Sequence, residues 1–136
     1  MKTKIFALSL AIAMLLCTLV SCGGGDSTGN DFITVELLVE AEEETIVTGP
    51  VRVYYDAAAG EKPTILMAVT QALDELNKSY KVNGGTISSI LNYSEVGNYY
   101  WDFTLNGQEA KTGFSVQEIK EGDNIVVFYA TFEDEL

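Results

Sequence analysis

The sequence contains no histidine, and its 136 residues include only two cysteines and two prolines. The absence of histidine excludes Ser-His-Asp catalysis, Cys-His catalysis and zinc sites with histidine ligands. No phosphate-binding loop, nucleophile elbow or reactive thiol motif is present. General acid–base catalysis would depend on carboxylates and tyrosines alone. We therefore expect that the protein is not an enzyme and that it carries neither a metal nor a catalytic cofactor.

Basic residues are also scarce, because 8 Lys and Arg stand against 20 Asp and Glu, for a net charge of -12. Phosphate binding requires concentrated Lys and Arg, so this excess of acid argues against nucleic acid as a partner. It also argues against adhesion to an anionic membrane through a basic face. The apolar content of 47% is sufficient for a packed core, and the length fits one domain.

The N-terminal segment has the pattern of a secretory signal. Lys2 and Lys4 precede an apolar run from Ile5 to Val20, which is shorter than the roughly 20 residues that a spanning helix needs. The run ends in Leu19-Val20-Ser21-Cys22, which resembles the bacterial lipoprotein box. The resemblance implies that residues 1–21 are cleaved and that Cys22 carries lipid, such as diacylglycerol and palmitate. The alternative is an ordinary secreted protein with a cysteine near its cleavage site.

Lipidation of Cys22 would hold the protein at the cell membrane or the outer membrane, on the extracytoplasmic side. Residues 22–31 would then be the lipidated cysteine and a flexible tether, because they are rich in Gly and small polar residues. Residues 32–133 would form the domain. Cleavage removes Lys2 and Lys4 but no acid, so the mature charge would be -14. It also removes Cys17, which leaves no possible disulfide.

The first half of the domain predicts two strands and a helix. Apolar and polar residues alternate from Phe32 to Glu40, and Ile46–Tyr55 reads as a second strand in which Gly49-Pro50 suggests a bulge or an edge position. Thr64 is the expected N-cap of the helix. Its apolar stripe would comprise Ile65, Val69, Ala72, Leu73, Leu76 and Tyr80, and Asn83-Gly84-Gly85 would end the segment.

The second half is expected to be β again. Residues 86–91 predict a short strand or a turn-like segment, and 99–105 a longer strand that is closed by the hairpin signal Asn106-Gly107, with 111–114 able to pair back. Residues 124–132 are apolar on both faces, so this strand is expected to be central or to meet something on its second face. The predicted fold class is α+β and β-grasp-like, with one helix packed on a mixed four- to five-stranded sheet.

Two motifs carry a family resemblance, namely the strand and turn Tyr100-Trp101-Asp102-Phe103-Thr104-Leu105-Asn106-Gly107 and the turn Glu121-Gly122-Asp123. With their surroundings, from Ile33 to Phe132, they resemble the small bacterial domain named after the C-terminal domain of transcobalamin and intrinsic factor. The resemblance implies a β-grasp fold on an envelope protein. In the animal vitamin carriers the comparable domain covers one face of cobalamin, together with a large helical domain that this chain lacks.

The candidate ligand- or partner-binding residues are Tyr99, Tyr100, Trp101, Asn106 and Phe114. Alternation places Tyr99 and Trp101 on one face and Tyr100 on the other. Trp101, the single tryptophan, is either a core residue or part of a flat surface for a planar ligand. Tyr and Trp suit such a surface because they lose little rotamer entropy and keep a polar handle.

The acidic residues offer weaker candidates. Asp102 is either a functional acid or a solvated residue of the outer face. Glu40 and the run Glu42, Glu43 and Glu44 are either a solvated turn or weak calcium ligands. The function expected overall is non-covalent binding of a corrinoid or another planar small molecule by an anchored envelope protein. The alternative is a structural module that docks another envelope protein or a second copy of itself.

Overall fold

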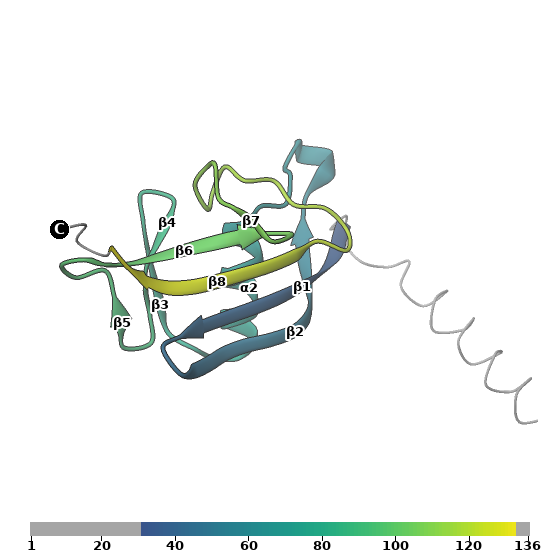
Figure 1. Ribbon diagram of the computed structural model, residues 1–136. Coiled ribbons are helices and arrows are strands. Elements are labelled where there is room, and N and C mark those ends of the chain that lie inside the picture. The colour runs from purple at the N-terminus through teal and green to yellow at the C-terminus, as the bar shows by residue number, and fades with distance from the viewer. Residues whose placement is uncertain (1–30, 133–136) are drawn as a thin grey trace, which may run out of the picture.

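The computed structural model describes residues 31–132, so the expected signal peptide, Cys22 and nearly all of the tether lie outside the described residues. A five-stranded sheet has the order β2-β1-β8-β6-β7. A three-stranded sheet, β3-β4-β5, and the helix α2 accompany it (Figure 1). The elements are β1 (Asp31–Ala41), β2 (Glu44–Tyr55), η2 (Ala57–Ala59), α2 (Ile65–Glu75), β3 (Tyr80–Asn83), β4 (Thr86–Ile90), β5 (Tyr93–Ser94), β6 (Tyr99–Leu105), β7 (Gln108–Glu109) and β8 (Asn124–Thr131).

The α+β class is confirmed, although most of the described elements are strands. The five-stranded sheet is mixed, because β8 runs parallel to β1 and antiparallel to β6. The finer β-grasp assignment stays a prediction. Within the described range, no helix is long and apolar enough to cross a membrane.

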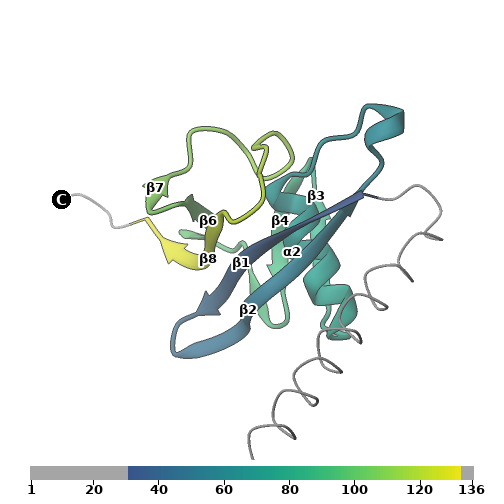
Figure 2. The ribbon, with the colours of Figure 1, turned by 90° about the vertical axis from the view of Figure 1, so that its right-hand side faces the viewer.

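The core lies on one side of the five-stranded sheet. The odd-numbered residues of β1, from Ile33 to Val39, are buried, as the alternation predicted. Ile125 and Val127 of β8 are fully buried on the same side. They pack with residues of α2 and β4, which cover this side of the sheet (Figure 2). β8 lies between β1 and β6, which confirms the central position expected from its two apolar faces.

One position at the β2 edge of this sheet is occupied by a side chain. β2 is an edge strand, as Gly49-Pro50 suggested, whereas the irregular register lies elsewhere, between Val39 and Glu40 of β1. The side-chain amide of Gln71, from α2, donates to the carbonyl of Tyr54 and accepts from the backbone N–H of Tyr54, both at 2.8 Å. The Gln71 amide thus occupies the place where a neighbouring strand would bond.

The helix is shorter than expected. Thr64 caps its N-terminus by accepting from the N–H of Met67, as predicted, but the apolar stripe does not continue to Tyr80. Asn77 has a φ of 54°, and the N–H of Lys78 donates to the carbonyl of Leu73, which is a Schellman ending. Leu76 is consequently 49% exposed. Tyr80 begins β3.

Two further expectations about turns and pairing were wrong. Asn83-Gly84-Gly85 does not end a helix but turns the chain from β3 into β4. Residues 111–114 do not pair back, because the pairing after the Asn106-Gly107 hairpin stops at Glu109. The hairpin itself is confirmed, with positive φ at both turn residues, 52° and 78°.

The Asn106-Gly107 turn and the Glu121-Gly122-Asp123 turn meet at one buried carboxylate. Asp123 is 4% exposed, and its two oxygens accept from the amide of Asn106 at 3.0 Å and from the N–H of Lys120 at 2.8 Å. The N–H of Glu36 in β1 donates to the carbonyl of Asp123. The two motifs that carried the resemblance therefore stabilise one junction of β1, β6 and β8.

Replacement of Asp123 by alanine is expected to lower the free energy of unfolding by about 2–3 kcal/mol, because two donors in part-buried hydrogen bonds lose a charged acceptor. Urea unfolding measures the difference. The matched control is Glu118→Ala, whose ion pair with Lys62 is largely exposed, and its expected effect is below about 0.5 kcal/mol. Equal effects of the two substitutions would contradict a structural role for Asp123.

Candidate functional site

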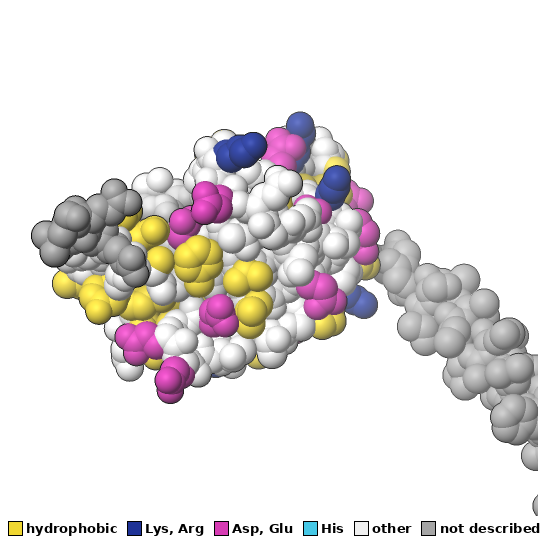
Figure 3. Space-filling view, in the orientation of Figure 1, with side chains coloured by type: hydrophobic (Ala, Val, Ile, Leu, Met, Phe, Trp, Pro, Cys, Tyr) yellow, Lys and Arg dark blue, Asp and Glu magenta, His cyan; other side chains and the backbone are white. Residues whose placement is uncertain are grey.

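The outer side of the five-stranded sheet carries an apolar surface that no described element covers. We define the open face as Leu38 of β1, Tyr100 of β6, and Val126, Phe128 and Ala130 of β8. Leu38 lies opposite Val126, and Tyr100 opposite Ala130, and all five are partly exposed. Figure 3 shows hydrophobic side chains gathered over these strands. Ile125 and Val127, which alternate with these residues along β8, are buried on the other side of the sheet. Both sides of β8 are therefore apolar.

Carboxylates border the open face. In the strand register, Phe128 lies between Glu40 of β1 and Asp102 of β6. Both acids share the side of the sheet that carries Leu38 and Tyr100, because each lies two residues further along its strand. Asp102 accepts from the N–H of Phe103 at 2.8 Å, which leaves its second oxygen available. Asp102 is thus a partly buried acid on the outer face of the sheet.

The predicted aromatic cluster is divided between the two sides of the sheet. Tyr100 lies on the open face and stacks on Phe132, with ring centroids 4.2 Å apart. Trp101 is only 3% exposed and belongs to the core, which confirms that alternative. Its indole N–H donates to the carbonyl of Tyr93 at 2.9 Å. Tyr99 is 45% exposed and stacks on Tyr129.

The other two candidate residues have structural contacts. Phe114 is buried against Phe103, with ring centroids 4.8 Å apart, and its carbonyl accepts from the N–H of Leu66. The side chain of Asn106 is bonded to Asp123 and to the N–H of Asn124. Of the five candidates, only Tyr99 and Tyr100 therefore present an aromatic ring to solvent.

Three tyrosines are held in their neutral form. The hydrogen bond from Tyr93 to Glu44, 2.9 Å long, is the main cause that raises the pKa of Tyr93 above its ordinary value. Burial raises the pKa of Tyr129, whose hydroxyl donates to the carbonyl of Ser94. Burial and a hydrogen bond to Asp74 raise the pKa of Tyr80. These phenols act as hydrogen-bond donors at neutral pH and are unsuited to accept protons.

The acidic side chains around the turn between β1 and β2 point to different surroundings. Glu42 lies in the tight turn between β1 and β2, Glu40 faces outward from β1, and Glu44 is engaged by Tyr93. Among residues 31–132 no group of three or more acidic or thiol side chains could hold a metal ion.

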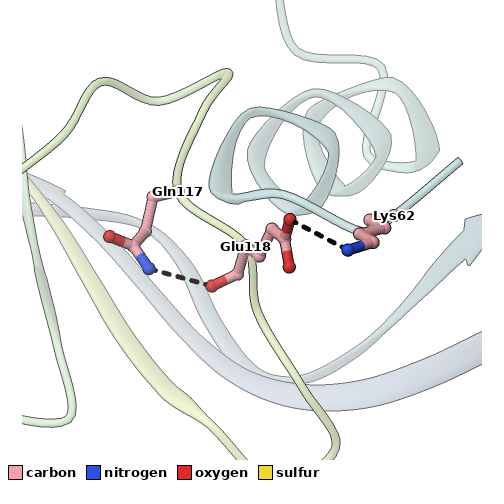
Figure 4. Close-up of polar contacts among 3 residues, drawn as sticks. All are labelled: Lys62, Gln117 and Glu118. Atoms are coloured by element: carbon pink, nitrogen blue, oxygen red, sulfur yellow. Dashed lines mark hydrogen bonds and ion pairs between the residues drawn. The ribbon is translucent and has the colours of Figure 1, made fainter.

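A groove lies where the segment before α2 crosses the segment before β8. The N–H of Ile119 donates to the carbonyl of Pro63, and the resulting groove of about 440 Å³ is floored by Ile33, Tyr55 and Pro63. At its rim Lys62 pairs with Glu118 at 3.6 Å, and Gln117 donates to the Glu118 carbonyl (Figure 4). The rim mixes charges of both signs and the groove is wide open, so no set of groups converges on a ligand.

The sequence patterns did not reveal this groove or the neighbours of Phe128. Both depend on which segments cross or pair, and no local motif encodes that. The two apolar sides of residues 124–132 were the one signal that pointed to the open face.

Solved structures resemble the fold. Haptocorrin, in a crystal structure in complex with Cbi, matches with a TM-score of 0.58 and 16% sequence identity over 76% of this chain. The chain spans about a quarter, 26%, of the length of haptocorrin. A candidate metal-binding protein from Ruminococcus gnavus matches with a TM-score of 0.46 and 11% identity, over 74% of this chain and 99% of that one.

Sequence comparison gives one assignment. No curated protein sequence matches the chain significantly. The family described as Domain of unknown function (DUF4430) matches residues 64–131, which is half of the chain and extends from the N-cap of α2 to the end of β8. The chain therefore belongs to the DUF4430 family.

Proposed function

We propose that this protein is a lipid-anchored envelope protein whose domain binds a flat small molecule, such as a corrinoid, non-covalently on the open face. The observation that carries the proposal is the uncovered apolar surface made by Leu38, Tyr100, Val126 and Phe128. A surface of this kind on a soluble domain usually marks a site of interaction. The proposed action is capture without chemical conversion.

The flatness of the surface favours a flat ligand. A sheet presents its side chains roughly in one layer, and Tyr100 and Phe128 offer rigid rings within it. A ring system lying on this layer would remove apolar area from water on both partners, at about 25 cal/mol for each Å². Tyr100 keeps a hydroxyl at the margin, where it can bond to a polar substituent of the ligand.

The corrinoid is suggested by the fold shared with haptocorrin, whose structure contains Cbi. The described part of this chain offers one face only, without a second layer to enclose a ligand. Because a ligand on one face buries less of its surface than an enclosed one, we expect modest affinity, with a Kd of roughly 1–100 µM.

The proposed lipid on Cys22 would determine where the domain meets its ligand. Lipid on Cys22, followed by the Gly-rich residues 23–30, would keep the domain near the membrane surface. In that position the open face could take up a ligand outside the cytoplasm and present it to a membrane protein. The absence of histidine from the sequence supports a role in binding without turnover.

Binding is tested by titrating cobinamide into the full chain, reconstituted in neutral phosphatidylcholine vesicles, while the fluorescence of Trp101 is recorded. Trp101 is the single tryptophan and lies in β6 beside Tyr100, so a bound corrinoid should quench it. Phe128→Thr is expected to weaken binding about tenfold, because it removes the central apolar contact of the open face.

The matched control is Val116→Thr, since Val116 is 65% exposed and lies outside the open face. It should bind like the unchanged protein. Absence of saturable quenching up to about 1 mM cobinamide, after correction for the light that cobinamide itself absorbs, would rule out corrinoid capture.

A second candidate function, docking of another polypeptide, is favoured by the β6 edge of the sheet. β7 pairs only with Thr104 and Leu105, so Tyr99–Phe103 has no strand partner on its outer side among the described residues. An extended peptide could add there as a further strand. Light scattering tests docking of a second copy, which predicts a concentration-dependent dimer, whereas ligand capture predicts a monomer.

A further inference from the structure

We infer that the ligand of the open face carries positive charge on two opposite sides of a flat apolar body. This inference rests on the proposed function and specifies the chemical class of the ligand. It is carried by the placement of Glu40 and Asp102 on either side of Phe128.

The spacing of the two acids follows from the sheet. Glu40 is in β1 and Asp102 in β6, and β8 lies between them. Neighbouring strands are about 4.8 Å apart, so the two backbones are separated by about 10 Å across Phe128. A ligand that covers Phe128 and extends over this width would place its two margins against the two carboxylates.

Neither carboxylate is neutralised within the described part of the chain. The Lys62–Glu118 contact is the one ion pair found among residues 31–132, and neither Glu40 nor Asp102 takes part in it. Arg52, which lies on the same side of the sheet, is placed over the ring of Phe32 at 5.0 Å. Phe32 and Glu40 are eight residues apart in β1, which is about 26 Å.

Other acidic residues on this side of the sheet also favour a positively charged ligand. Glu36 of β1 and Glu109 of β7 share this side of the sheet, because they are paired with Pro50 and Thr104 in the register. A neutral apolar ligand would remove water from Glu40 and Asp102 without replacing their hydrogen bonds, which is unfavourable. A ligand with cationic margins would replace the lost water by charge-assisted bonds.

Two porphyrins of similar size and opposite charge test this inference. One carries four N-methylpyridinium groups, and the other carries four sulfonatophenyl groups. With the full chain in neutral phosphatidylcholine vesicles, and with protein-free vesicles subtracted, the cationic porphyrin is expected to bind at least about tenfold more tightly. Absorbance and Trp101 fluorescence both report binding.

The overall negative charge of the chain could by itself favour the cationic porphyrin, so the decisive comparison is between two double variants of equal net charge. Glu40→Gln with Asp102→Asn should weaken binding of the cationic porphyrin about five- to tenfold. Glu61→Gln with Glu75→Gln changes two exposed acids elsewhere and should change binding less than about twofold. Circular dichroism verifies that both variants are folded.

The outcomes separate this inference from the proposed function. Equal losses in the two double variants, or equal binding of the two porphyrins, would overturn the cationic preference. If Phe128→Thr still weakened binding in that case, the open face would remain the binding surface. Failure of cobinamide and of both porphyrins to bind would reject the proposed function and this inference together.

Discussion

Replacement of Trp101 by alanine is expected to lower the free energy of unfolding by about 3–5 kcal/mol. The side chain is 3% exposed and packs between Tyr93 and Tyr129, with ring centroids at 6.5 Å and 5.2 Å. Its removal leaves a cavity and also leaves the carbonyl of Tyr93 without the indole donor. Urea unfolding of the purified chain, monitored by circular dichroism, measures the loss.

The matched control for this substitution is Tyr99→Ala, two residues earlier in the same strand. Tyr99 is 45% exposed, and its replacement should cost less than about 1 kcal/mol. A Trp101→Ala variant that kept its stability and lost only ligand binding would show that Trp101 is a surface contact and would contradict its place in the core.

Replacement of Cys22 by serine is expected to abolish lipid attachment and, in any cleaved product, membrane association. Two or three acyl chains on one residue make a stable anchor, and serine offers no thiol to which the diacylglycerol can be transferred. Phase partitioning in detergent measures the association, and an intact mass spectrum measures both the attached lipid and the cleavage before residue 22.

Cys17→Ser provides the control for the anchor, because Cys17 would leave with the signal peptide. This variant should be processed, lipidated and membrane-bound like the unchanged protein. Processing and membrane association of Cys22→Ser would instead support an ordinary secreted protein or another mode of attachment.

Much of the fold could be predicted because its strongest signals are local. The alternation in β1, the cap at Thr64 and the Asn106-Gly107 turn each depend on residues close in sequence. The end of α2 was missed because Leu76 and Tyr80 continue the helical spacing by coincidence. The deciding residue is Asn77, which tolerates a positive φ and reverses the chain before the spacing ends.

The candidate site could be predicted only in part, for a related reason. Alternation correctly separated Tyr100 from Trp101, since the two sides of a strand differ at every residue. The neighbours of Phe128 come from strands that are distant in sequence, and the parallel pairing of β1 with β8 has no local signal. Phe114 was misjudged because a single aromatic residue in a loop carries no periodicity that marks it as core.

The Gln71 amide on Tyr54 also limits how copies of the chain could assemble. Growth of a continuous sheet through many molecules requires two receptive edges on each molecule, and this side chain blocks one of them near the end of β2. Association through the β6 edge would join two copies in a symmetric pair, in which each β6 is the strand partner of the other. Near Tyr54, strand addition at the β2 edge would first have to displace the Gln71 amide.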